Sequence, residues 1–249
     1  MKTFGKSAAL WSFLILALVA LGPVLFAEDG SKDTGNLFEK IMGIKAGAFG
    51  IIVQSVILLV SIFMIGWAIE CFVNVQRDKI VPPEVVAHLQ GYIDEGDLEG
   101  AVQYCEAAPN TLTRIMHGPL IRMQNGWDAM VGAADQQISV ESGKLNYHIS
   151  PLALVSALGP MFGLFGTVSG MVGAFDKMAA EGPNMSPSAV AGSIGLALMS
   201  TVMGLVIAIP GMIFFWLFQN RTIRIMDDIT LIVDDMLDQL RGYIDQAKA

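Results

Sequence analysis

Residues 149–175 read ISPLALVSALGPMFGLFGTVSGMVGAF and contain no charged side chain. About 20 consecutive apolar residues are enough for a helix to cross a bilayer, so this stretch is long enough to span one. Two other stretches have the same character. Residues 189–218 also lack charge, and residues 46–73 contain Glu70 as their single charged group. The sequence therefore predicts three transmembrane helices.

The composition of the whole chain supports this fold class. Of its 249 residues, 53% are hydrophobic and only 15% are charged, whereas an ordinary soluble domain has about 25% charged residues. The alternative is a soluble protein with buried core helices, but too few charged residues remain to cover such a core. The net charge of −8 argues against a nucleic-acid-binding protein, which needs a basic face. We expect an all-α integral membrane protein.

The N-terminal region has the layout of a secretory signal. Lys2 and Lys6 precede an apolar run at residues 8–26, and the small Ala27 is followed by a polar stretch. We expect residues 1–27 to be a signal peptide, or an uncleaved anchor, because Leu25 is unfavourable three positions before the cleavage point. In both cases residues 28–45 would form a periplasmic N-terminal segment.

Basic residues next to the spans indicate their orientation, because cytoplasmic loops carry an excess of Lys and Arg. Arg77 and Lys79 follow the first span, Lys144 precedes the second, and Arg221 and Arg224 follow the third. We therefore expect residues 74–148 and 219–249 in the cytoplasm. The loop of residues 176–188 would lie in the periplasm, together with the mature N-terminus.

Both cytoplasmic segments are predicted to be helical. In residues 74–148, Pro82 and Pro83 are typical of a helix start. Breaks between short helices are expected at Gly91, Gly96, Gly100, a turn around Pro109, and Pro119. Residues 219–249 should continue the third span as an amphipathic helix. Its apolar face consists of Ile225, Ile229, Ile232, Val233, Met236 and Leu240.

Motifs of the common enzyme classes are absent from the sequence. There is no P-loop, GxGxxG, HExxH or CxxC motif. We therefore predict no enzymatic activity, no cofactor and no metal site. Cys71 and Cys105 are interpreted as small apolar fillers. The three histidines, which are scattered, are interpreted as structural or exposed: His88, His117 and His148.

Small residues gather on one side of the second and third spans. Such residues let membrane helices approach closely. In the second span they are Gly159, Gly163, Gly166, Gly170 and Gly173, with Thr167 beside them and Pro160 expected to interrupt the helix. In the third span they are Ala189, Ser193, Ala197, Ser200, Gly204, Ala208 and Gly211, with Thr201 beside them and Pro210 expected to kink the helix.

Two interpretations of these faces stay open. One is a tight helix interface whose hydroxyl groups bond to carbonyls of their own helices. The other is a narrow ion path lined by Thr167, Thr201, Ser200 and Ser193. Neither span supplies an acid, and a proton relay needs a titratable group, so the acid would come from another chain. Glu70 is expected to reach the headgroup region or to pair with Arg77. The second interpretation is that Glu70 is a minor polar site in a proton relay.

Two segments resemble signatures of a known family. Residues 158–175, LGPMFGLFGTVSGMVGAF, and residues 197–210, ALMSTVMGLVIAIP, resemble the second- and third-span signatures of the MotA/TolQ/ExbB proton channel family. The order of one span, a cytoplasmic helical segment and two spans is also similar. The chain is more similar to ExbB and TolQ than to the flagellar stator subunit, which has four spans.

The resemblance implies an ion-channel subunit of the bacterial inner membrane. Such subunits form a ring, typically a pentamer, around the single spans of ExbD- or TolR-like partners that carry a membrane aspartate. Ion flow, usually of protons, then drives work on the periplasmic side. Thr167 and Thr201 match polar pore positions of the family. Leu196 stands where ExbB and TolQ commonly have a glutamate, so a non-conducting membrane scaffold with the same helix packing is the alternative.

Overall fold

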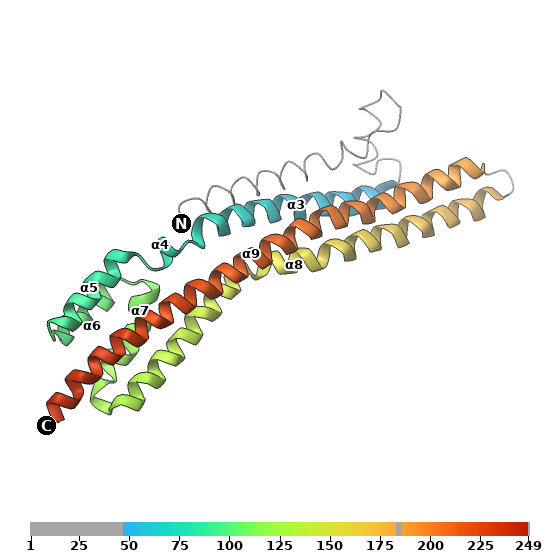
Figure 1. Ribbon diagram of the computed structural model, residues 1–249. Helices are drawn as coiled ribbons and strands as arrows, with labels where there is room; N and C mark the ends of the chain where they lie inside the picture. The colour runs from blue at the N-terminus through green and yellow to red at the C-terminus, as the bar shows by residue number, and fades with distance from the viewer. Residues whose placement is uncertain (1–46, 183–185, 249) are drawn as a thin grey trace. The chain divides into compact units, whose positions relative to one another are not determined.

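The computed structural model describes residues 47–182 and 186–248, with side chains over 52–182 and 186–242. The expected signal peptide (1–27) and periplasmic segment (28–45) lie outside these residues. Helices and short connections account for the whole described part, which confirms the all-α prediction (Figure 1). In chain order they are α3 (Gly47–Asn74), α4 (Arg77–Ile80), α5 (Pro83–Asp94), α6 (Leu98–Ala107), α7 (Thr111–Ile121), a 3-10 turn η2 (Met123–Asn125), α8 (Trp127–Glu181) and α9 (Pro187–Lys248).

Three of these helices, α3, α8 and α9, are long and apolar enough to cross a membrane. They contain the three predicted spans, and α9 also confirms that the C-terminal segment continues the third span without a break. Residues 176–181 still belong to α8, so part of the segment 176–188 is helical, and its position outside the membrane stays a prediction. One expectation is wrong. Pro160 does not interrupt α8, which continues through it and through Pro151, because membrane helices tolerate the loss of a single N–H donor when neighbouring helices hold them.

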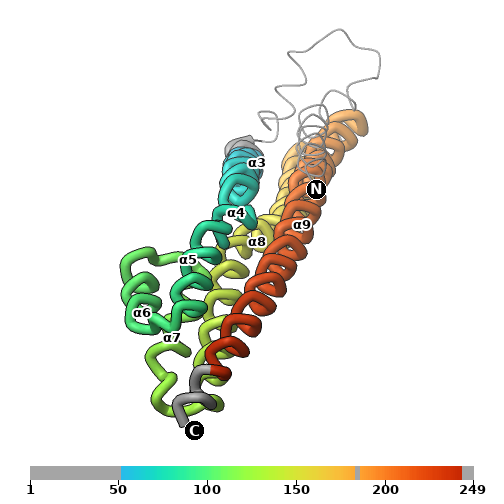
Figure 2. The backbone as a smooth tube through the Cα atoms, turned by 60° about the vertical axis from the view of Figure 1, so that its left-hand side comes forward, coloured from blue at the N-terminus to red at the C-terminus, as the bar shows by residue number. Residues whose placement is uncertain are grey.

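The chain divides into two compact units. Among the described residues, the first contains 47–67 and Pro151–Phe214, and thus the most apolar lengths of α3, α8 and α9. The second contains Ala68–Ser150 and residues 215–248, and thus the short helices α4 to α7. Within the second unit, α5, α6 and α7 pack against one another (Figure 2).

Local signals define the short helices of the second unit. Pro83 begins α5, as predicted, and the Asp97 carboxylate caps α6 by accepting a hydrogen bond of 2.9 Å from the Gly100 amide. Gly96 separates the two helices with a φ of 71°, a conformation that favours glycine. Gly91 and Gly100 lie inside α5 and α6, so the prediction that they break the segment is wrong, because nothing at these positions needs a left-handed backbone.

The start of α7 and the position of Pro119 each test a prediction made from the sequence. The turn expected around Pro109 is present, and Asn110 begins α7 with a reciprocal capping box to Thr113. Pro119 lies inside α7 rather than ending it, since the helix continues to Ile121. Its side chain is buried in the core, where packing offsets the missing N–H.

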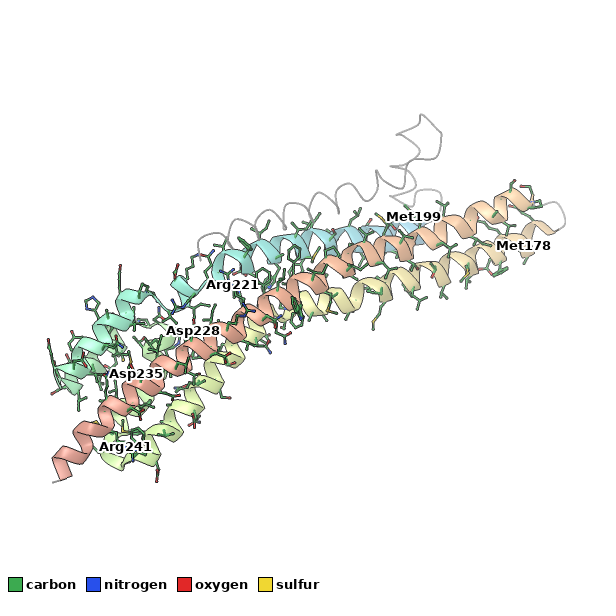
Figure 3. All side chains as sticks on the ribbon, viewed as in Figure 1. Met178, Met199, Arg221, Asp228, Asp235 and Arg241 are labelled. Atoms are coloured by element: carbon green, nitrogen blue, oxygen red, sulfur yellow. The ribbon has the colours of Figure 1, made fainter. Side chains whose placement is uncertain are left out.

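The predicted apolar stripe of α9 forms much of the core of the second unit. Ile225, Ile229, Val233, Met236 and Leu240 are buried, while Ile232 is half-buried. The aspartates on the opposite side are exposed, among them Asp228 and Asp235, which Figure 3 labels on α9. Contacts within the same chain anchor the helix: Arg77 Nε lies 2.9 Å from Asp228 Oδ2, and the Arg241 guanidinium lies 5.1 Å from the Trp127 ring centre. Residues of the segment 74–148 therefore contact this part of α9 within the same chain.

Candidate functional site

The two small-residue faces pack directly against each other in the first unit, where α8 and α9 lie side by side (Figure 1). A Cβ atom added to Gly163 would lie 2.9 Å from Thr201 Cα and 3.0 Å from Ser200 O. One added to Gly159 would lie 2.9 Å from Gly204 O. These contacts are with backbone atoms, which cannot turn away, so only glycine allows this approach.

The contact continues along both helices. Gly166 faces Ser200, with 2.6 Å between an added Cβ and Ser200 Cβ, and Gly170 faces Ala197 at the same distance. Gly173 is not part of the interface, because an added Cβ would have no atom within 4 Å. The structure thus brings together four of the five predicted glycines with Ala197, Ser200, Thr201 and Gly204. The expected kink at Pro210 stays a prediction.

The hydroxyl groups along these faces differ in their surroundings. Thr167 is only 5% exposed, and its Oγ1 donates a hydrogen bond of 2.7 Å to Leu164 O. Ser193 Oγ donates to Ala189 O at 3.1 Å. Both bonds stay within one helix, which fits the tight-interface interpretation. Ser200 and Thr201 are half-buried and contact the glycine face.

Gln54 on α3 is a polar residue that the sequence analysis did not single out. Its side chain is buried, and its Nε2 atom has no hydrogen-bond partner among the described residues. Its neighbour Val53 contacts the glycine face, with Cγ1 3.2 Å from a Cβ added to Gly166. An amide in an otherwise apolar span is a signal that could have revealed this position, because buried polar groups in a membrane are costly.

Glu70 has different partners from those expected. Arg77 pairs with Asp228, so the predicted Glu70–Arg77 pair is wrong. Instead, Glu70 Oε2 lies 2.8 Å from His148 Nε2, and Glu70 Oε1 accepts a hydrogen bond from the Asn74 amide. The thiol of Cys71 completes a cluster in which one donor atom of each of Glu70, Cys71 and His148 lies within 4.8 Å of the others. His148 is far from Glu70 and Cys71 in the sequence, so no local pattern connects it to them.

A second ionic cluster joins α7 to α8. The Glu141 carboxylate is 3% exposed and accepts hydrogen bonds from Arg114 Nη2 at 2.8 Å and from Lys144 Nζ at 2.6 Å. Burial alone would raise the pKa of Glu141, but the hydrogen bonds and charges of Arg114 and Lys144 outweigh burial and hold its pKa below the ordinary value. The ionised Glu141 carboxylate and Arg114 therefore stabilise the contact between α7 and α8.

Comparison with known proteins bears on the packed faces. Residues 108–230 match the model of the MotA/TolQ/ExbB proton channel family, and this segment includes both small-residue faces. This segment therefore belongs to the MotA/TolQ/ExbB proton channel family. Glu70 and Cys71 lie outside the matched residues.

Several curated relatives carry the name ExbB. The chain is 38% identical over 106 residues to the biopolymer transport protein ExbB of Xanthomonas campestris pv. campestris (strain B100), which is 43% of this chain and 42% of that protein. It is 36% identical over 93 residues to ExbB of Neisseria gonorrhoeae, covering 37% and 42%. A putative ExbB-like protein of Synechocystis sp. is 25% identical over 198 residues, covering 78% and 75%. The chain thus spans less than half the length of the first two relatives.

Proposed function

We propose that the chain is a proton-channel subunit of the bacterial inner membrane, and that it couples ion flow to mechanical work on the periplasmic side. The observation that carries the proposal is the α8–α9 interface, which lies within the segment matching the proton channel family. There, Ser200 and Thr201 contact the glycine face beside the buried Thr167. The load would be transport across the outer membrane or its maintenance.

The titratable group of the path would come from a partner chain. Residues 149–175 and 189–218 contain no acid, so they cannot by themselves bind and release a proton. An ExbD- or TolR-like protein with one span and a membrane aspartate would supply the acid. Each charge that crosses a potential of 100 mV releases about 2.3 kcal/mol, which is enough to bias a conformational change.

The threonine hydroxyls have a chemical role in this proposal. The Thr167 hydroxyl donates a hydrogen bond to Leu164 O, so the lone pairs of its oxygen stay available as hydrogen-bond acceptors. The half-buried Thr201 hydroxyl would order a water molecule beside the partner's aspartate. Both groups would stabilise an ion or a charged carboxylate that passes through an apolar region.

Exposed apolar side chains support a homo-oligomer surrounded by lipid, with a pentamer as the expected form. On α8 they include Met161, Leu164, Val168, Val172 and Phe175, and on α9 Leu198, Leu205, Ile209 and Met212. Neighbouring copies and lipid would cover these surfaces. The expected orientation, with the mature N-terminus in the periplasm, follows from the basic residues that flank the spans.

The test begins with purification of the tagged chain from native membranes and mass spectrometry of the proteins that accompany it. We expect a small single-span protein with an aspartate in its span. The complex is then reconstituted in vesicles, and proton uptake down an imposed gradient is followed with a pH-sensitive dye. Thr201→Val and Thr167→Val keep the side-chain size but remove the hydroxyl, and they should lower the proton flux at least ~10-fold while the complex still assembles.

Ser139→Ala serves as the matched control, since Ser139 is exposed and lies on α8 before the predicted span. Its flux should equal that of the original chain. An unchanged flux in both threonine variants would contradict the proposal. So would the absence of a single-span partner, which would favour the scaffold alternative suggested by Leu196 and by hydroxyls bonded within their own helices.

A further inference from the structure

We propose that Glu70, Cys71 and His148 form a binding site for a transition-metal ion, with Zn²⁺ as the preferred ion. We call these three residues the α3–α8 triad. Their donor atoms, a carboxylate oxygen, a thiol sulfur and an imidazole nitrogen, lie within 4.8 Å of one another. The site goes beyond the proposed channel function and does not depend on it.

The donor set favours zinc over the hard cations. Mg²⁺ and Ca²⁺ prefer oxygen ligands, whereas thiolate and imidazole together are typical ligands of Zn²⁺. Zn²⁺ sites with three protein ligands keep a fourth position for water or another ligand. The α3–α8 triad supplies three ligands of this kind. Cys71 is fully buried, and the facing atoms Glu70 Oε2 and His148 Nε2 are also buried, although each of these two side chains is 37% exposed as a whole.

The distances require only small side-chain adjustments. Zinc binds nitrogen at about 2.0–2.1 Å and carboxylate oxygen at about 2.0–2.2 Å, so tetrahedral ligands of this kind stand about 3.4 Å apart. Glu70 Oε2 and His148 Nε2 lie 2.8 Å apart. A small shift of the His148 ring would open this gap. Cys71 Sγ lies within 4.8 Å of the other two donor atoms, which leaves room for the longer zinc–sulfur bond of about 2.3 Å.

Neighbouring residues leave the Glu70 carboxylate suited to a metal. Arg77, the cation nearest in sequence, is engaged by Asp228. Asn74 donates a hydrogen bond to Glu70 Oε1, which fixes the carboxylate with Oε2 toward His148. Hydrogen bonds of this kind orient metal ligands and tune their affinity. Zinc bound here would connect α3 to α8 within the second unit.

The experiment uses the full chain in detergent, with Co²⁺ as a spectroscopic probe and Zn²⁺ as the competitor. Cobalt bound to a thiolate gives a sulfur-to-metal charge-transfer band in the near ultraviolet. We expect one Co²⁺ per chain, a charge-transfer band, and its loss on addition of Zn²⁺. Cys71→Ser should abolish the band, and His148→Ala and Glu70→Gln should weaken binding about 10- to 100-fold.

Cys105→Ser and His117→Ala are the matched controls, since they remove the other cysteine and a histidine on α7. Both should bind cobalt like the original chain. Absence of cobalt binding, or a band that persists in Cys71→Ser or disappears in Cys105→Ser, would overturn the site. Should Cys71→Ser fail to fold, the half-exposed His148→Ala still decides the matter: unchanged affinity in this variant would also overturn the site.

Discussion

Substitution of Gly163 by alanine tests the packing on which the candidate site rests. The added Cβ would stand 2.9 Å from Thr201 Cα, whereas carbon atoms pack best at about 3.5–4.0 Å, so α8 and α9 must separate locally by at least about 0.6 Å. The obstructing atoms belong to the α9 backbone, and no rotation of a side chain relieves the clash. Overpacking of this kind costs about 1–3 kcal/mol.

Gly173→Ala is the matched control on the same helix. An added Cβ at this position meets no atom within 4 Å. Both variants gain about 0.5–1 kcal/mol, because alanine is a better helix former than glycine. The difference between the two therefore isolates the steric cost, and we expect Gly163→Ala to be less stable than Gly173→Ala by about 1–3 kcal/mol.

The assay is reversible unfolding of the full chain in mixed micelles, with the helix content followed by circular dichroism as the fraction of denaturing detergent rises. The free energies of unfolding of the two variants are compared with that of the original chain. Equal stability of Gly163→Ala and Gly173→Ala would refute the close contact between α8 and α9, and with it the placement of Thr201 at the glycine face.

Three further predictions concern the second unit. Gly96→Ala should cost about 1–2 kcal/mol of unfolding free energy, because Gly96 has a φ of 71°. The control Gly91→Ala lies inside α5, where an added Cβ meets no atom, and it should be neutral or stabilising. Equal effects of the two substitutions would contradict the boundary between α5 and α6. Because the folded-state pKa of Glu141 lies below the ordinary 4.5, its stabilising contribution is complete above about pH 4.5 and is lost as the pH falls through the folded-state pKa. In Glu141→Gln, the unfolding free energy should therefore fall less steeply as the pH drops below 4.5. Arg114→Ala should lower the unfolding free energy by about 1.5–3 kcal/mol at neutral pH. Burial, and then the charge of the adjacent Glu106, raise the pKa of Cys105 to about 11. Alkylation of Cys105 by iodoacetamide at pH 8, measured by mass spectrometry, should therefore be slow until the chain is unfolded. Rapid labelling of the folded chain would contradict this prediction.

Much of the architecture could be predicted because it depends on local and periodic properties of the chain. The three apolar stretches predicted three long helices, and the small residues at three- and four-residue spacing predicted which side of α8 and α9 faces a neighbour. The errors arose where single residues were taken as decisive. Gly91, Gly100, Pro119 and Pro160 lie inside helices, since tertiary packing outweighs the modest local cost of one glycine or proline.

The sequence by itself determined the helical class, the spans and the small-residue faces, because hydrophobic length and helical periodicity act over neighbouring residues. Only the tertiary structure decided which distant residues meet. It placed Gly163 against Thr201, left Gly173 in open space, and paired Glu70 with His148 instead of Arg77. Such pairings depend on the rotation and register of one helix against another, which the packing of many side chains sets together and which no local pattern encodes.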